Sequence, residues 1–330
     1  MSASVSETTT EELSSRSLIN HKGHAGDKIF KGLSVGSGIM ILVILAAVAI
    51  FLIVETLPAL QASDENLPLG NTFSYVVPFL FGTVWSSFLA LLIAVPIAMG
   101  IALYISHYAP KKMAAPIGFV IDLLAAVPSV VFGLWGIQTL APAMVPIYQW
   151  LNEHLGFIPL FGGTVAGTGR SMMTAALVLA IMVLPIITSL SREVFLRTPK
   201  LQEEASLALG ATRWEMICQV VIPFGRSGVV SAAMLGLGRA LGETMAVAMV
   251  LSPATLVSFK LLTSQNSNTI AANIAQSFPE AHGLEVSQLL ATGLVLFVLT
   301  FIVNMVGRMI TSDKNQRAVA KPKRAGKEDK

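Results

Sequence analysis

Two opposite charges interrupt an otherwise apolar stretch, LGLGRALGETMAV, at residues 235–247. Arg239 and Glu243 are four residues apart, so on a continuous helix they would lie on one face and could pair with each other. An arginine side chain also presents a planar fork of N–H donors that suits a tetrahedral oxyanion, and a neighbouring carboxylate can orient that fork. The stretch therefore predicts either an ion pair that locks helices together or an oxyanion-binding arginine.

Other patterns that could do chemistry are weak. The segment GGTVAGTGRS, residues 162–171, is rich in glycine, but a phosphate-binding loop needs glycine where Thr164 stands and lysine where Arg170 stands. The five histidines fall in tails and loops, and the single cysteine, Cys218, has no ligand cluster around it in the sequence. We therefore expect no catalytic set, no metal site and no cofactor in this chain.

The composition is that of an all-α membrane protein. Of the 330 residues, 54% are hydrophobic and 12% are charged, whereas about a quarter of the residues in a soluble domain are charged. A helix of roughly 20 apolar residues spans a bilayer, and the uncharged runs together with helix breakers predict six transmembrane helices. Their expected bounds are 33–54, 80–105, 115–139, 171–191, 227–252 and 287–308. Pro128 is expected to bend the third helix, because proline removes a backbone hydrogen bond.

The positions of lysine and arginine orient these helices. If both tails are cytoplasmic, the outer loops hold only Arg170 and Lys260 of the 22 Lys and Arg residues, and Arg239 remains in the membrane. Cytoplasmic loops carry an excess of positive charge, so the sequence favours this orientation. The basic run KPKRAGKEDK near the C-terminus suits anionic lipid at the membrane surface, and we expect no nucleic-acid partner.

Charged residues inside the predicted spans are costly. Arg239 lies 12 residues beyond Ser227, or ~18 Å into its helix and close to the middle of a bilayer. A charge at that depth costs about 2.5 to 3.5 kcal/mol, so it must face protein or water. Gly238 and Gly242 form a GxxxG pair that would admit a close neighbouring helix. Asp122, ~10 Å from the inner surface, is expected to be a structural intramembrane charge.

The longest inner connection, residues 192–226, contains the sequence EEASLALGATRWEMICQVVIP. Glu203 and Glu204 are expected to open a short helix, because acidic side chains favour a helix N-terminus. Gly210 is expected to break the chain between two helices, and Pro223 to end the second helix before the next span. By periodicity alone, the loop equally fits an amphipathic segment that lies on the membrane surface.

This loop resembles the inner-loop signature of the type I ABC importer permeases, which reads E-A-A, three residues, G, nine residues and I-x-L-P. Glu204, Ala205 and Ser206 stand at its first three positions, so serine replaces the last alanine, and Gly210 stands at the glycine. The signature is completed by Val220, Ile222 and Pro223. The resemblance implies the type I permease fold with a cytoplasmic coupling helix that docks on an ATPase subunit. It also implies that Glu204, Ala205 and Gly210 serve that coupling.

The segment GLGRALGETMAV resembles the signature of the phosphate-specific transport permeases, and within them the PstC-type subunits. The Pro-Ser pair of the third span and the segment LVLAIMVLPIIT resemble the same subunits, and the likeness extends from about Phe79 to Arg308. The resemblance implies that Arg239 and Glu243 line a pathway for inorganic phosphate. It also implies the partners: a second homologous permease subunit, a dimer of ATP-binding subunits that hold ATP and Mg, an outside phosphate-binding protein and the lipid bilayer.

Two alternatives stay open at this point. The first is a permease for another oxyanion, such as sulfate or molybdate, because one arginine and one carboxylate do not by themselves distinguish these anions. The second is an ion-coupled secondary phosphate carrier, in which Arg239, Glu243 and Asp122 would form a relay. Such a carrier has no need of a segment that docks on an ATPase.

The expected organisation has four parts. Residues 1–28 would form a disordered cytoplasmic tail, and residues 29–78 a first transmembrane helix with an acidic periplasmic loop. Residues 79–311 would form the permease core, including the coupling loop at 192–226, and residues 312–330 a basic cytoplasmic tail. We expect a transport subunit without enzymatic activity of its own, located in the bacterial cytoplasmic (inner) membrane with both termini inside.

Overall fold

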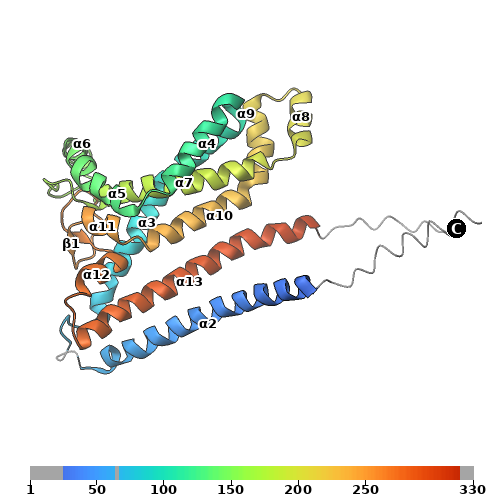
Figure 1. The fold of residues 1–330 in the computed structure, drawn as a ribbon. Coiled ribbons are helices and arrows are strands. Elements are labelled where there is room, and N and C mark those ends of the chain that lie inside the picture. Colours follow the sequence, from blue (N-terminus) through green and yellow to red (C-terminus); the bar gives the residue numbers. More distant parts are fainter. Residues whose placement is uncertain (1–24, 64–66, 320–330) are drawn as a thin grey trace, which may run out of the picture. The chain divides into compact units, whose positions relative to one another are not determined.

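The computed structural model describes residues 25–63 and 67–319, most of them in helices (Figure 1). One compact unit ends at Val54 and the other begins at Glu55, so their boundary falls inside the first described helix, α2 (Ala25–Gln61). The predicted tail at 1–28 overlaps the described residues only at 25–28, where α2 begins. The predicted tail at 312–330 is helical up to Val319, as the end of α13 (Leu284–Val319), and the rest of it lies outside the described residues.

Six helical segments in the described ranges are long and apolar enough to cross a membrane, which confirms the predicted number and the all-α class. Their bounds are Ile29–Gln61, Thr72–Tyr108, Ser129–Leu155, Met172–Leu196, Arg213–Leu241 and Leu284–Ile310. The third and fifth differ most from the predicted bounds. In both spans the difference arises at a proline, Pro128 in the third and Pro223 in the fifth, whose effect depends on the surrounding chain.

The third predicted span, 115–139, is wrong because the chain leaves the helix before Pro128. Helix α4 (Lys111–Ala125) ends there, and a new helix, α5 (Ser129–Trp135), begins directly after the proline. Pro128 itself is extended, with φ −59° and ψ 138°. A helix tolerates proline at its start better than in its interior. The chain therefore breaks completely at Pro128, where the sequence predicted only a bend. The span then continues through a π-helical turn, η3 (Gly136–Leu140), into α6 (Ala141–Leu155).

The fifth span begins earlier than predicted because Pro223 does not end a helix. Helix α9 (Arg213–Met216), the π-helical turn η4 (Ile217–Val221) and α10 (Ile222–Leu241) follow one another without a gap. In η4 the Ile222 N–H donates to the Ile217 carbonyl, five residues back. The widened turn places Pro223 at the start of α10, where a residue without an N–H is tolerated.

The core of the larger unit is formed by α3 (Thr72–Leu103), α7 (Met172–Leu196) and α10. Helix α3 continues into a π-helical turn, η2 (Tyr104–Tyr108). Alanines recur at every fourth position of α3 and have no exposed surface: Ala90, Ala94, Ala98 and Ala102. This stripe of small side chains lets α3 and α7 pack closely. Close packing stabilises helix pairs in a membrane, where no hydrophobic effect drives helices together.

Glycines of α10 set its contact with α7, which runs in the opposite direction. A Cβ on Gly228 would lie 2.4 Å from Cγ2 of Val194, and a Cβ on Gly236 would lie 2.8 Å from Cδ1 of Ile187. The predicted GxxxG pair does not make this contact. Gly238 and Gly242 are exposed, and no neighbouring atom lies within 4 Å of a Cβ on Gly238. The prediction that this pair packs closely is therefore wrong within this chain, because the helix turns a different glycine toward α7.

The segment between α10 and α13 is not a plain polar connector. It forms α11 (Met245–Val250), two short parallel strands, β1 (Pro253–Ala254) and β2 (Asn266–Ser267), and α12 (Ile270–Ser277). Leu251, Leu261 and Ile270 are almost completely buried, and the Ile270 N–H donates to Thr83 Oγ1 of α3 at 2.9 Å. In Figure 1 this segment lies at one end of the unit, whereas α9 and α8 (Lys200–Ala208) lie at the other.

Candidate functional site

The charged stretch lies where the fifth span breaks. Helix α10 ends at Leu241 with Gly242 as its C-cap, and α11 begins at Met245, so Glu243 lies between two helices. Within the described residues Arg239 and Glu243 form no ion pair. The predicted pairing is therefore wrong, because a spacing of four residues brings side chains together only while the helix continues.

Glu243 is bound to the backbone that follows it. The residue is 8% exposed, and Oε1 accepts a hydrogen bond from the Ala246 N–H at 3.1 Å. A carboxylate at this place satisfies a backbone donor of the first turn and meets the positive end of the helix dipole. Glu243 therefore stabilises the first turn of α11.

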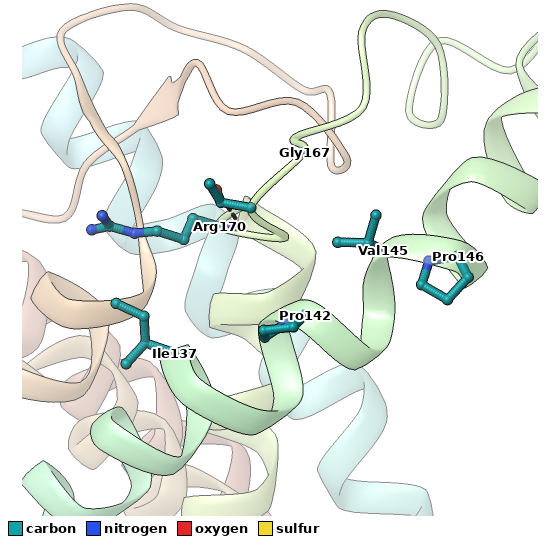
Figure 2. A pocket seen from close by; sticks show the side chains of 7 residues that line it. Ile137, Pro142, Val145, Pro146, Gly167 and Arg170 are labelled. Atoms are coloured by element: carbon teal, nitrogen blue, oxygen red, sulfur yellow. Dashed lines mark hydrogen bonds between the residues drawn. The ribbon is translucent and has the colours of Figure 1, made fainter.

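Arg170 holds the opposite end of α11. Its Nη2 donates to the Leu251 carbonyl at 3.1 Å, so a cation lies at the C-terminus of this six-residue helix and a carboxylate at its N-terminus. Figure 2 shows the Arg170 side chain extending away from Val145 and Pro146. It is the charged residue in the lining of a cavity of about 670 Å³, whose other lining residues are Ile137, Pro142, Val145, Pro146, Gly167 and Thr168.

Arg239 lies in the last turn of α10. Contacts of Gly228 with Val194 and of Gly236 with Ile187 set the register of α10 on α7, so Arg239 is level with Leu184, the middle residue of α7. Its Nε is buried, and no hydrogen-bond partner for it exists in the described part of the chain. An unsatisfied buried donor of this kind costs free energy until an acceptor reaches it.

Asp122 lies apart from this break. It is exposed on α4 and forms no ion pair with any described residue. One turn earlier, a Cβ on Gly118 would lie 2.3 Å from Nη1 of Arg192, so this arginine lies against the α4 backbone. Asp122 therefore forms no ion pair with Arg239, and no group of three or more His, Cys, Asp or Glu residues in the described ranges could hold a metal ion.

The connection at residues 192–226 has the predicted form of two helices around a glycine. Helix α8 carries Glu203 in its first turn, Gly210 has φ +92°, and α9 is capped by Thr212 and Glu215. A positive φ is easily adopted only by glycine, which explains the residue type at 210. Glu204 and Ala205 are exposed, and α8 buries none of its residues. Leu201 and Leu209 are 79% and 90% exposed.

Comparison with known proteins identifies the family. Residues 94–315 match the family described as "Binding-protein-dependent transport system inner membrane component". The chain is 45% identical over 302 residues to "Phosphate transport system permease protein PstC 2" of Mycobacterium tuberculosis, which covers 88% of this chain and 93% of that protein. The chain belongs to this family of transport permeases. It is also 38% identical over 317 residues to the PstC permease of Mesorhizobium japonicum, covering 93% of this chain and 96% of that one.

Solved structures agree on the fold of the permease. A bacterial ABC transporter that imports the acidic polysaccharide alginate matches with a TM-score of 0.58 at 15% identity, over 90% of this chain and 97% of that one. The same transporter in complex with an alginate pentasaccharide-bound periplasmic protein matches with a TM-score of 0.59 at 15% identity, over 86% and 96%. The permease therefore has the type I ABC importer fold, as the sequence predicted.

Sequence reasoning missed the contribution of Arg170 to this site. It considered that arginine only as a mismatch to a phosphate-binding loop, although Arg170 was one of two cations expected in the outer loops. The scarcity of cations in the expected outer loops was the signal that could have pointed to Arg170. Its partner, the Leu251 carbonyl, is 81 residues away in the sequence, so no local pattern could have revealed the contact.

Proposed function

We propose that this permease moves inorganic phosphate across the bacterial cytoplasmic membrane as a subunit of an ATP-driven importer. The observation that carries the proposal is Arg239, a cation level with the middle of α7, whose Nε is buried without a partner in the described chain. The relatives named as phosphate transport permeases are similar over almost their whole length, which favours phosphate over sulfate or molybdate as the anion.

In this mechanism, Arg239 supplies the charge and Glu243 supplies the geometry. A guanidinium group gives two parallel hydrogen bonds to a tetrahedral oxyanion and offsets part of the cost of removing the anion from water. Glu243, held by the Ala246 N–H, keeps the chain break between α10 and α11 in place. The carboxylate then stays clear of the anion that Arg239 binds, which avoids repulsion between two negative groups.

The permease would work with partners on both sides of the membrane. We assign α8 as the coupling helix, because Leu201 in this helix and Leu209 at its C-cap are exposed and offer an apolar surface to an ATPase subunit. The full assembly would contain a second homologous permease, two ATP-binding subunits that hold ATP and Mg, and an outside phosphate-binding protein. The family description and the alginate transporter in complex with its periplasmic protein support the last of these. In this assignment both termini are cytoplasmic and the chain hydrolyses nothing itself.

The function can be tested by phosphate uptake into membrane vesicles that contain the full assembly. We expect phosphate to accumulate when ATP is supplied and the ion gradients are collapsed, because the energy comes from hydrolysis. Loss of all uptake on collapse would instead support an ion-coupled carrier. Unlabelled sulfate or molybdate should compete poorly with labelled phosphate, and stronger competition by either would reassign the substrate.

A substitution at Gly210 tests whether α8 couples ATP hydrolysis to transport. Gly210→Pro should lower phosphate uptake to background while the protein still assembles, because proline holds φ near −65° and removes the N–H that donates to the Leu207 carbonyl. Gly210→Asn is the matched control, since asparagine tolerates positive φ and no atom lies within 4 Å of a Cβ there. Unchanged uptake by Gly210→Pro would remove α8 from the coupling path.

A further inference from the structure

The coupling helix α8 is weakly attached to the rest of the permease. None of its residues is buried, and its backbone hydrogen bonds are local. A polar contact joins it to a membrane-spanning helix: Oε1 of Glu203 lies 3.6 Å from Nε2 of His107, in the π-helical turn η2 at the end of α3. No other side-chain ion pair or hydrogen bond in the described ranges joins α8 to a spanning helix.

The surroundings of His107 orient its ring toward Glu203. Its Nδ1 lies 2.7 Å from Ser106 Oγ, and that hydroxyl is also 3.3 Å from the Leu103 carbonyl. With Nδ1 engaged by Ser106, Nε2 is the ring nitrogen that faces the Glu203 carboxylate. The side chains of His107 and Glu203 are only 10% and 21% exposed, so solvent screens the contact less than it screens a surface ion pair.

Helix α3 connects this contact to the outer side of the permease. In the first half of α3, Thr83 Oγ1 accepts the Ile270 N–H, and a Cβ on Gly82 would lie 2.2 Å from the Asn268 carbonyl oxygen. Between the two ends, the alanine stripe of α3 packs on α7. One continuous helical segment, Thr72–Tyr108, therefore touches α8 at its last turn and the outer segment around β2 and α12 in its first half.

We propose that His107 and Glu203 are positioning residues that fix the coupling helix α8 to the inner end of α3, so that movement of α8 displaces α3 and the outer segment bound to it. The proposal rests on the proposed ATP-driven function, in which α8 receives the movement of the ATPase. Without the contact, α8 follows its ATPase while α3 stays behind. ATP is then hydrolysed with less phosphate moved.

The test uses the complete transporter in vesicles and measures both ATP hydrolysis and phosphate uptake. Glu203→Gln and His107→Gln should each lower the phosphate moved per ATP by roughly two- to fivefold, the range that a contact of about 0.5 to 1 kcal/mol can produce. His107→Lys should keep the ratio close to that of the parent protein, because the lysine ammonium can bind the Glu203 carboxylate from the same turn. The exchanged pair His107→Glu with Glu203→His should restore most of the ratio.

The matched control is Glu193→Gln. Glu193 pairs with Arg197 on the same helix, and both side chains are largely exposed, so breaking this pair should leave the ratio unchanged. If the exchanged pair stays as low as the single variants, or if both glutamine variants keep the parent ratio, the proposal is wrong. If a glutamine variant fails to assemble, His107→Lys and the exchanged pair test the proposal instead, because the proposal requires both to assemble and to move phosphate at close to the parent ratio per ATP. Failure of the parent protein to move phosphate with ATP would instead overturn the proposed function itself.

Discussion

Replacing Arg239 by glutamine is expected to reduce phosphate uptake by at least about a hundredfold while the permease still assembles with its partners. Each hydrogen bond from a charged group contributes roughly 1.5 to 3 kcal/mol, and two of them to one anion account for a loss of this size. Glutamine is shorter and neutral, and its single amide cannot reproduce the fork. Labelled phosphate uptake into vesicles measures the effect, and co-purification of the other subunits checks assembly.

Two further variants separate charge from geometry at the same break. Arg239→Lys keeps the charge but loses the planar fork, so we expect partial uptake that is clearly below that of the parent protein. Glu243→Gln keeps an oxygen that can accept the Ala246 N–H, so uptake should stay within a few-fold of the parent. Complete loss in Glu243→Gln with normal assembly would show that its charge acts on the anion directly. Normal transport in Arg239→Gln would remove the arginine from the mechanism.

Replacing Gly82 by alanine is expected to destabilise the permease strongly. The new Cβ would lie 2.2 Å from the carbonyl oxygen and 2.9 Å from the carbonyl carbon of Asn268. Both atoms belong to the backbone, so no rotamer change can relieve the clash, and α3 must move away from β2 and α12. Overpacking of this kind costs about 1 to 3 kcal/mol, occasionally more. The melting temperature of the purified permease in detergent should fall, and phosphate uptake should fall with it.

Gly100→Ala provides the control on the same helix. No atom lies within 4 Å of a Cβ on Gly100, and alanine favours a helix over glycine by up to about 1 kcal/mol. Its melting temperature should be unchanged or slightly raised. Equal melting temperatures for Gly82→Ala and the parent protein would contradict the close approach between α3 and the outer segment.

Particular residues show how far sequence reasoning reached. The six spans were found because a helix that crosses a bilayer needs about 20 apolar residues and must satisfy its own backbone hydrogen bonds. This requirement is visible in the local composition of the sequence. Gly210 was found because a helix that ends on a left-handed residue selects glycine. Both are local demands, so the sequence alone carries them.

The errors share a different cause. Pro128 was expected to bend a helix and Pro223 to end one. Instead, Pro128 separates two helices, and Pro223 lies inside a continuous span after a π-helical turn. Gly238 and Gly242 fit a packing motif, but Gly236 faces α7. Whether a proline breaks a helix, and which glycine packs against another helix, depends on residues that are distant in the sequence. Those residues supply the hydrogen bonds that proline removes and the side chains that contact a glycine.

By itself, the sequence determined the membrane class, the number of spans and the two signatures that place the chain among the type I permeases. The tertiary structure decided what happens inside LGLGRALGETMAV. The helix ends at Leu241, Glu243 caps the next helix, and Arg170 holds the far end of that helix from another part of the chain. A spacing of four residues predicts a pair only on an unbroken helix, and whether a helix stays unbroken is settled by the contacts that compensate its lost hydrogen bonds. That break leaves Arg239 without its expected carboxylate.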